Sequence, residues 1–145
     1  MIKRFQEVRE AAKGQPLKKL AIVSAHAPHT VRSGLIAQEE GIAVPIFIGE
    51  RETIETLLRN EGLDPKNFRI EAADGEEAAA LRAVELARSG EAEILLKGNL
   101  STSVLMKKVL NKEAGLRTGH LLSDILLAEV KVDGKVKLIG VTDGG

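Results

Sequence analysis

Short apolar runs alternate with longer amphipathic segments along most of this chain of 145 residues. Residues 20–24, 44–48, 68–71 and 94–97 have the length and the apolar character of strands. The segments between them have the periodicity of helices. Because consecutive parallel strands need a crossover, usually a helix, this alternation favours a mainly parallel sheet with helices on both faces. The pattern therefore predicts an α/β fold.

Helices are expected in five segments, at residues 2–13, 30–40, 52–60, 76–89 and 101–110. The clearest is 76–89, which is rich in Ala, Leu and Glu. Asp74 is its expected N-cap, and Gly90 is a suitable residue to end it.

The last part of the chain predicts a β-hairpin. Apolar runs at residues 121–132 and 136–141 flank Asp133 and Gly134, and Asp-Gly is a strong signal for a two-residue turn. We expect this hairpin to be an antiparallel addition at the end of the parallel sheet. With 43% hydrophobic and 29% charged residues, the chain is long enough for one core, so residues 1–145 are expected to form a single α/β domain.

Composition excludes several classes of protein. Lys plus Arg and Asp plus Glu both number 21, so no net field attracts nucleic acid or an anionic membrane. Three Phe and no Trp or Tyr leave little for bases to stack on. With no signal peptide or apolar span, the expected location is cytoplasmic. The absence of Cys excludes disulfides, thiolate metal sites and a cysteine nucleophile.

The segment from Lys97 to Ser103 combines a cation, a glycine and small hydroxyl residues where a strand meets a helix. Ligands of open parallel sheets gather at the carboxyl ends of strands, and a helix N-terminus favours anions. Gly98 allows close backbone approach and Ser101 can cap the helix. The loop is therefore either a phosphate site or an ordinary strand-to-helix turn with a capping serine. Its spacing is not that of a P-loop.

A second glycine-bounded loop contains Arg117 and Thr118, between Gly115 and Gly119. A guanidinium group can grip an anion with two parallel hydrogen bonds. The alternative is an arginine in an exposed turn.

The three histidines have no assigned role. His26 and His29 follow the first expected strand, but Pro28 interrupts a helix between them and no further ligands complete a zinc site, so no metal is expected. His120 lies near Arg117 without a visible partner.

From residue 92 onward the chain resembles the phosphate acetyl/butyryl transferase family, and its butyryl branch most. The resemblance is carried by AEILLKGNLSTSVLMKKVLNK at residues 92–112, GLRTG at 115–119 and VTD at 141–143. It implies one domain of a two-domain enzyme with a fold like that of isocitrate and isopropylmalate dehydrogenases. Only the N-terminal half of such an enzyme is expected here, with the second domain absent.

The resemblance also implies an activity. Family members transfer an acyl group between coenzyme A and inorganic phosphate, with coenzyme A as a substrate and without a cofactor or metal. Carried over to this sequence, the phosphate-binding residues are Lys97, Gly98, Asn99, Ser101, Thr102, Arg117 and Thr118, and Arg117 is the expected catalytic residue. The chain is thus expected to be a transferase that binds acyl-CoA and phosphate. A homo-oligomer is possible, and we expect an exposed apolar patch on the surface.

Two other functions stay open. A noncatalytic module or inactive fragment would bind phosphate or acyl-CoA without turnover. A decarboxylating-dehydrogenase-like domain is disfavoured by the lack of Gly-x-Gly-x-x-Gly after the first strand, although that fold does not require the motif.

Overall fold

The computed structural model describes residues 2–120 and 122–142, which fall into two compact units. One unit is residues 17–118, and the other combines residues up to 16 with those from 119 onward. A compact unit is defined by contacts and a domain by independent folding, so the expectation of a single domain over residues 1–145 stays a prediction.

The larger unit contains a four-stranded parallel sheet in the order β3-β2-β1-β4. Its elements follow one another as β1 (Lys18–Val23), α2 (Pro28–Glu39), β2 (Ala43–Gly49), α3 (Arg51–Asn60), the 3-10 helix η1 (Pro65–Asn67), β3 (Arg69–Ala72), α4 (Glu76–Arg88), β4 (Ile94–Lys97) and α5 (Thr102–Val109). The α/β expectation with a mainly parallel sheet is confirmed, because every strand of this sheet runs the same way.

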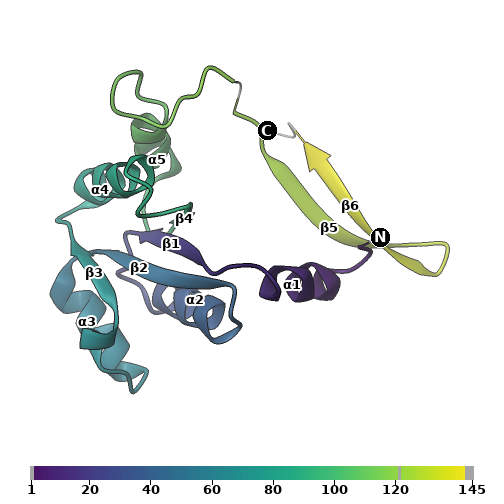
Figure 1. Cartoon of the computed structure of the whole chain (residues 1–145), viewed down its shortest axis with the longest axis horizontal. Helices are drawn as coiled ribbons and strands as arrows, with labels where there is room; N and C mark the ends of the chain where they lie inside the picture. Colours follow the sequence, from purple (N-terminus) through teal and green to yellow (C-terminus); the bar gives the residue numbers. More distant parts are fainter. Residues whose placement is uncertain (1, 121, 143–145) are drawn as a thin grey trace. The chain divides into compact units, whose positions relative to one another are not determined.

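Alternate residues of the central strands enter two separate cores. Ala21 and Val23 of β1 pack with the alanine-rich face of α4 and with α5. Ile22 of β1 and Phe47 of β2 pack with α2 and α3 on the opposite face. Successive side chains of a strand point to opposite faces, so these two cores place helices on both sides of the sheet (Figure 1).

The smaller unit contains α1 (Phe5–Lys13) and a two-stranded antiparallel sheet of β5 (Ile125–Val132) and β6 (Lys135–Thr142). The expected turn is present, because Asp133 and Gly134 both have positive φ, at 50° and 75°. Apolar side chains are exposed on this hairpin, with Ile125 at 68% and Leu126 at 67%. Within the unit, the Phe5 amide donates to the Glu129 carboxylate.

Two local expectations are wrong. The hairpin forms a sheet of its own and is not an addition to the parallel sheet. The N-cap of α4 is Gly75, at φ 83°, and not Asp74. The edge strand β4 is covered on one face only, because Ile94 and Leu96 are exposed while Leu95 packs against the core beside α4. Gly90 ends α4 as expected, with φ 76° after the C-cap Ser89.

Candidate functional site

Two loops meet at the carboxyl edge of the parallel sheet, one after β1 and one after β4. The chain continues from β1 to β2 on one side, whereas β4 lies on the other side of β1. The Gly98 amide donates to the Val23 carbonyl at 2.9 Å, and the Asn99 amide donates to the Ser24 carbonyl at 3.1 Å. Ligands of open α/β sheets bind at such a switch point of strand order. The loop at residues 97–103 therefore lies where the fold favours a ligand.

Gly98 permits the close approach of these two loops. A Cβ at this position would lie 2.4 Å from the Val23 carbonyl oxygen and 2.7 Å from that of Ser24. Gly98 thus allows two backbone segments to approach each other, and its expected role in backbone contact with an anion stays a prediction. No larger residue fits without moving β1 or the loop.

Lys97 turns back onto its own loop. Its ammonium donates to the Leu100 carbonyl at 2.9 Å and to that of Gly98 at 3.4 Å. An ammonium group has three N–H donors, so one remains for another acceptor. Lys97 is exposed, and it stabilises the loop while keeping that donor available.

The start of α5 has no side-chain cap. Ser101 occupies the N-cap position, but its hydroxyl lies 2.7 Å from the Ser103 hydroxyl and not on the helix amides. The Ser101 amide donates instead to the Glu76 carboxylate at 3.0 Å. The expected capping by Ser101 is therefore wrong, and the amides of the first turn, beginning with the exposed Thr102, have no side-chain acceptor.

Charged side chains also join α4 to α5. The Lys108 ammonium lies 2.6 Å from the Glu77 carboxylate, so these residues link the two helices. This hydrogen bond, together with the charge of Lys108, lowers the pKa of Glu77. With Glu76 on Ser101, both acidic residues of the first α4 turn contact the α5 segment.

Asn99 contacts a histidine from the other loop. The Asn99 amide nitrogen lies 3.0 Å from His26 Nε2. An amide nitrogen only donates, so Nε2 accepts and the neutral ring carries its proton on Nδ1. His26 is thereby placed at the site, although no sequence pattern had assigned it a role.

Arg117 and Thr118 lie in the loop after α5, and both are exposed. The Leu116 amide donates to the Val109 carbonyl at 2.7 Å, which fixes the loop to the C-terminal end of α5. Eight helical residues span about 12 Å, and Lys97 precedes the opposite end of the helix. Within the described residues, Arg117 makes no hydrogen bond or ion pair. Its convergence with Lys97 on one anion stays a prediction.

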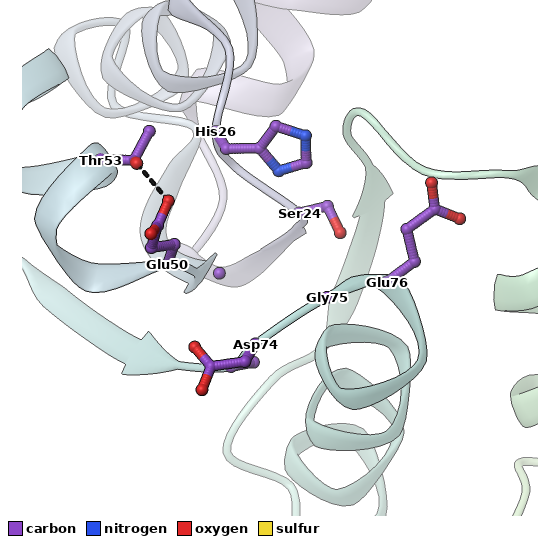
Figure 2. Close-up of a pocket in the computed structure, with 9 residues that line it drawn as sticks. Ser24, His26, Glu50, Thr53, Asp74, Gly75 and Glu76 are labelled. Atoms are coloured by element: carbon purple, nitrogen blue, oxygen red, sulfur yellow. Dashed lines mark hydrogen bonds between the residues drawn. The ribbon is translucent and has the colours of Figure 1, made fainter.

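A cavity of about 730 Å³ lies at the carboxyl ends of β1, β2 and β3. Its polar lining consists of Ser24, His26, Glu50, Thr53, Asp74 and Glu76 (Figure 2). The Thr53 hydroxyl donates to the Glu50 carboxylate at 2.5 Å. None of the residues expected to bind phosphate lines this cavity, but Ser24, His26 and Glu76 of its lining contact the loop at 97–103.

The described residues contain neither a candidate metal site nor a candidate membrane span. No group of three or more His, Asp or Glu side chains among them could hold a metal ion. No helix within residues 2–120 or 122–142 combines the length and the apolar character that a membrane span requires.

Sequence comparison places the chain among known proteins. It is 34% identical over 143 residues to the phosphate butyryltransferase of Clostridium beijerinckii, covering 99% of this chain and 47% of that protein. The phosphate butyryltransferase of Clostridium acetobutylicum is 34% identical over 131 residues, covering 90% of this chain and 44% of its own. The chain is thus a relative of the phosphate acetyl/butyryl transferases. It spans less than half the length of these curated relatives.

Further relatives of the family agree with this. The phosphate acetyltransferase of Thermotoga maritima is 33% identical over 126 residues, covering 87% of this chain and 42% of its own. A branched-chain phosphotransacylase from Enterococcus faecalis has 28% identity and a TM-score of 0.62, over 86% of this chain and 42% of its own. A Streptococcus pyogenes phosphotransacetylase, 14% identical, shares the fold at a TM-score of 0.71 over 93% of this chain and 50% of its own. No protein-family model matches the chain.

Sequence reasoning missed three residues of this region: Ser24, His26 and Glu76. Ser24 was read as the end of a strand, and nothing in its neighbours signals its positive φ of 58°. His26 was considered only as a metal ligand. Glu76 had no assigned role, because its contact with Ser101 bridges 25 residues of sequence.

Proposed function

We propose that this phosphate acetyl/butyryl transferase relative takes part in the transfer of a short-chain acyl group, butyryl or acetyl, between coenzyme A and inorganic phosphate. The observation that carries the proposal is the 34% identity to two phosphate butyryltransferases over 90% and 99% of this chain. The chain spans less than half of either protein, so the complete activity is inferred from the relationship.

The reaction needs charge stabilisation more than it needs a cofactor. A phosphate oxygen attacks the thioester carbonyl carbon, the carbon–sulfur bond breaks, and acyl phosphate and the coenzyme A thiolate are formed. Negative charge develops on the carbonyl oxygen and then on sulfur, while phosphate brings its own charge. Donors aimed at these positions in a water-poor cleft supply several kcal/mol, typically about 3–4 kcal/mol for one donor.

The loop at residues 97–103, the phosphate-side loop, has the donors for this role. Lys97 retains one N–H after its two carbonyl contacts. The uncapped amides at the start of α5 add the positive end of a helix dipole next to Thr102. Asn99 and Ser101 border these groups in the sequence. This set supports the assignment of Lys97, Gly98, Asn99, Ser101 and Thr102 to phosphate binding.

Arg117 and Thr118 complete the proposed phosphate site from the loop after α5. Arg117 has no partner among the described residues, so its guanidinium group is available for an anion. A planar fork of donors suits a phosphoryl group because it forms two parallel hydrogen bonds. We assign Arg117 the catalytic role of neutralising charge on the transferring group.

We also propose the architecture, the cofactor requirement, the location and the partners of the protein. The domain architecture is that of isocitrate and isopropylmalate dehydrogenase-like proteins, supported by the parallel sheet with helices on both faces. The protein uses coenzyme A as a substrate with no cofactor, works in the cytoplasm and binds no nucleic acid, and a homo-oligomer is possible. The balanced charge of 21 basic and 21 acidic residues supports the absence of nucleic-acid binding.

Thiol release provides the test. The chain is incubated with butyryl-CoA and phosphate, and free coenzyme A is measured with a thiol reagent, to which the cysteine-free protein contributes nothing. Arg117→Ala and Lys97→Ala are expected to lower phosphate-dependent release at least tenfold. Arg32→Ala is the matched control, because Arg32 is exposed on α2 and its ion pair with Glu61 is long, at 3.9 Å.

A second candidate function is favoured by one observation. The chain covers 44% and 47% of the two butyryltransferases, so groups needed for turnover can lie outside it. In that case the chain is a noncatalytic module that binds phosphate or acyl-CoA. Saturable phosphate binding that is lost in Arg117→Ala, without thiol release, supports this candidate. If the chain shows neither thiol release nor phosphate binding, both candidate functions are overturned.

A further inference from the structure

The cavity at the ends of β1, β2 and β3 is lined by Ser24, a buried residue whose hydroxyl has no partner among the described residues. Ser24 is only 2% exposed, and its hydroxyl forms no hydrogen bond with another described residue. Every fully enclosed side-chain polar atom within residues 2–120 and 122–142 has a partner, so the Ser24 hydroxyl must open onto the cavity that it lines. Figure 2 shows it on the side that faces Glu76. A hydroxyl that reaches the cavity from an otherwise buried residue is available to a ligand or to water.

The backbone at Ser24 is also unusual. Its φ of 58° lies in the left-handed region, which non-glycine residues rarely adopt. The Ala25 amide, next in the chain, donates to the Ile48 carbonyl at 2.9 Å and holds this turn against β2. Strain of this kind is found at ligand sites, where the surroundings hold a side chain in a required direction.

The remaining polar groups of the cavity are mostly acceptors. The Asp74 carboxylate forms no hydrogen bond within the described residues, and Glu50 has one carboxylate oxygen engaged by Thr53 and the other free. The neutral His26 ring adds one donor at Nδ1, because its Nε2 accepts from Asn99. Figure 2 shows a ring nitrogen of His26 on the side of Ser24. The cavity thus offers acceptors together with groups that both donate and accept.

This lining disfavours charged ligands of two kinds. No Lys or Arg lines the cavity, and its carboxylates repel phosphate. The described acidic and histidine side chains include no group of three that could hold a metal ion. A neutral ligand is compatible with this lining if it donates to the carboxylates and accepts from Ser24 or His26. Hydroxyl groups can do both.

We propose that this cavity binds a neutral ligand with a vicinal diol, of the ribonucleoside or sugar class. In doubly wound sheets, an acidic residue near a strand end binds ribose hydroxyls, and Glu50 directly follows β2. A diol bridging Asp74 or Glu50 would leave a hydroxyl for Ser24. The site goes beyond the proposed acyl transfer, since it involves none of the residues assigned to phosphate.

Equilibrium binding of three probes to the full chain tests the proposal. Adenosine, D-ribose and 2′-deoxyadenosine are titrated separately, by ligand-observed NMR or calorimetry. Binding of both diols indicates recognition of the diol itself, and binding of adenosine alone indicates a ribonucleoside site. In either case 2′-deoxyadenosine is expected to bind about tenfold more weakly or worse, the loss expected for one hydrogen bond to a charged group.

Two variants locate the site. Ser24→Gly removes the hydroxyl while fitting the positive φ, so the fold is retained. Asp74→Asn removes a charge from an exposed side chain. Each should weaken binding of the diol about tenfold, whereas Glu39→Gln on the outer face of α2 should not. Phosphate binding, measured in parallel, should be unchanged in Ser24→Gly, which separates this proposal from the acyl-transfer proposal.

Three results would overturn the proposal. They are the absence of saturable binding by adenosine and by ribose, equal affinity for adenosine and its 2′-deoxy analogue, and binding that neither variant weakens.

Discussion

The Asn99 amide nitrogen lies 3.0 Å from His26 Nε2, which joins the loop after β4 to the loop after β1. Two backbone hydrogen bonds, from Gly98 to Val23 and from Asn99 to Ser24, run beside this contact. The side-chain pair therefore extends the pairing of two adjacent parallel strands past their ends. It fixes the direction of Asn99 next to the phosphate-side loop.

Asn99→Ala is expected to weaken phosphate binding more than it lowers stability. Both partners are exposed, so the lost hydrogen bond should cost no more than about 1 kcal/mol of unfolding free energy. The loop, however, loses the contact that orients it, and the dissociation constant for phosphate should rise severalfold. Thermal unfolding and phosphate titration measure the two effects, with Asn60→Ala on α3 as the control. A large stability loss with unchanged phosphate affinity would contradict this role.

Gly98→Ala should disturb both loops at once. The added Cβ would lie 2.4 Å from the Val23 carbonyl oxygen, which belongs to a buried strand and cannot turn away. We expect a loss of about 1–3 kcal/mol of unfolding free energy, measured by denaturant titration. Gly14→Ala is the matched control, because its Cβ would have no atom closer than 3.9 Å and its φ is −82°. Equal stability of the two variants would show that the loop approach is not tight.

Glu76→Ala is expected to strengthen phosphate binding. The Glu76 carboxylate accepts from the Ser101 amide at 3.0 Å, and its negative charge lies beside the start of α5. Removing it frees an amide donor and removes repulsion of an incoming anion. Calorimetric titration with phosphate should show a lower dissociation constant in Glu76→Ala than in Glu39→Ala. Weaker binding in Glu76→Ala would indicate instead that Glu76 positions the loop for its ligand.

Stability should fall in acid partly through Glu71. Burial alone would raise the pKa of Glu71, but hydrogen bonds from Arg69 and Arg82 outweigh it and hold the pKa below its ordinary value. The folded state therefore binds this proton less readily than the unfolded state. The resulting stability is complete above the ordinary pKa of 4.5 and is lost as the pH falls through the lowered value.

Glu71→Gln tests this assignment. The variant should be less stable than the unmodified chain at neutral pH, and the difference should shrink as the pH falls below the ordinary pKa of glutamate. Chemical unfolding across an acid pH series measures this, with Glu39→Gln on the exposed face of α2 as the control. A difference that stays constant with pH would show that Glu71 contributes by packing and not by its charge.

The sequence predicted the elements of the parallel sheet because their signals are local. Residues 94–97 were expected as a strand, and β4 is Ile94–Lys97. The other strands and the helices differ from the expected ranges mainly at their ends, where capping competes with periodicity. Asp74 shows this, since the glycine after it takes the N-cap position with φ 83°. The Asp133-Gly134 turn was predictable because two positive φ values demand such residues.

The sequence alone also identified the loop at 97–103, because its residue types and their relationship to known transferases are properties of the chain itself. Only the tertiary structure decided what surrounds that loop. His26, Glu76 and the cavity at Ser24 are brought there by strand order and by helix packing. These contacts join residues 25 to 73 positions apart, and no local pattern records a partner at that distance. Periodicity fixes which face of an element is apolar, whereas the meeting of polar side chains depends on how the elements pack.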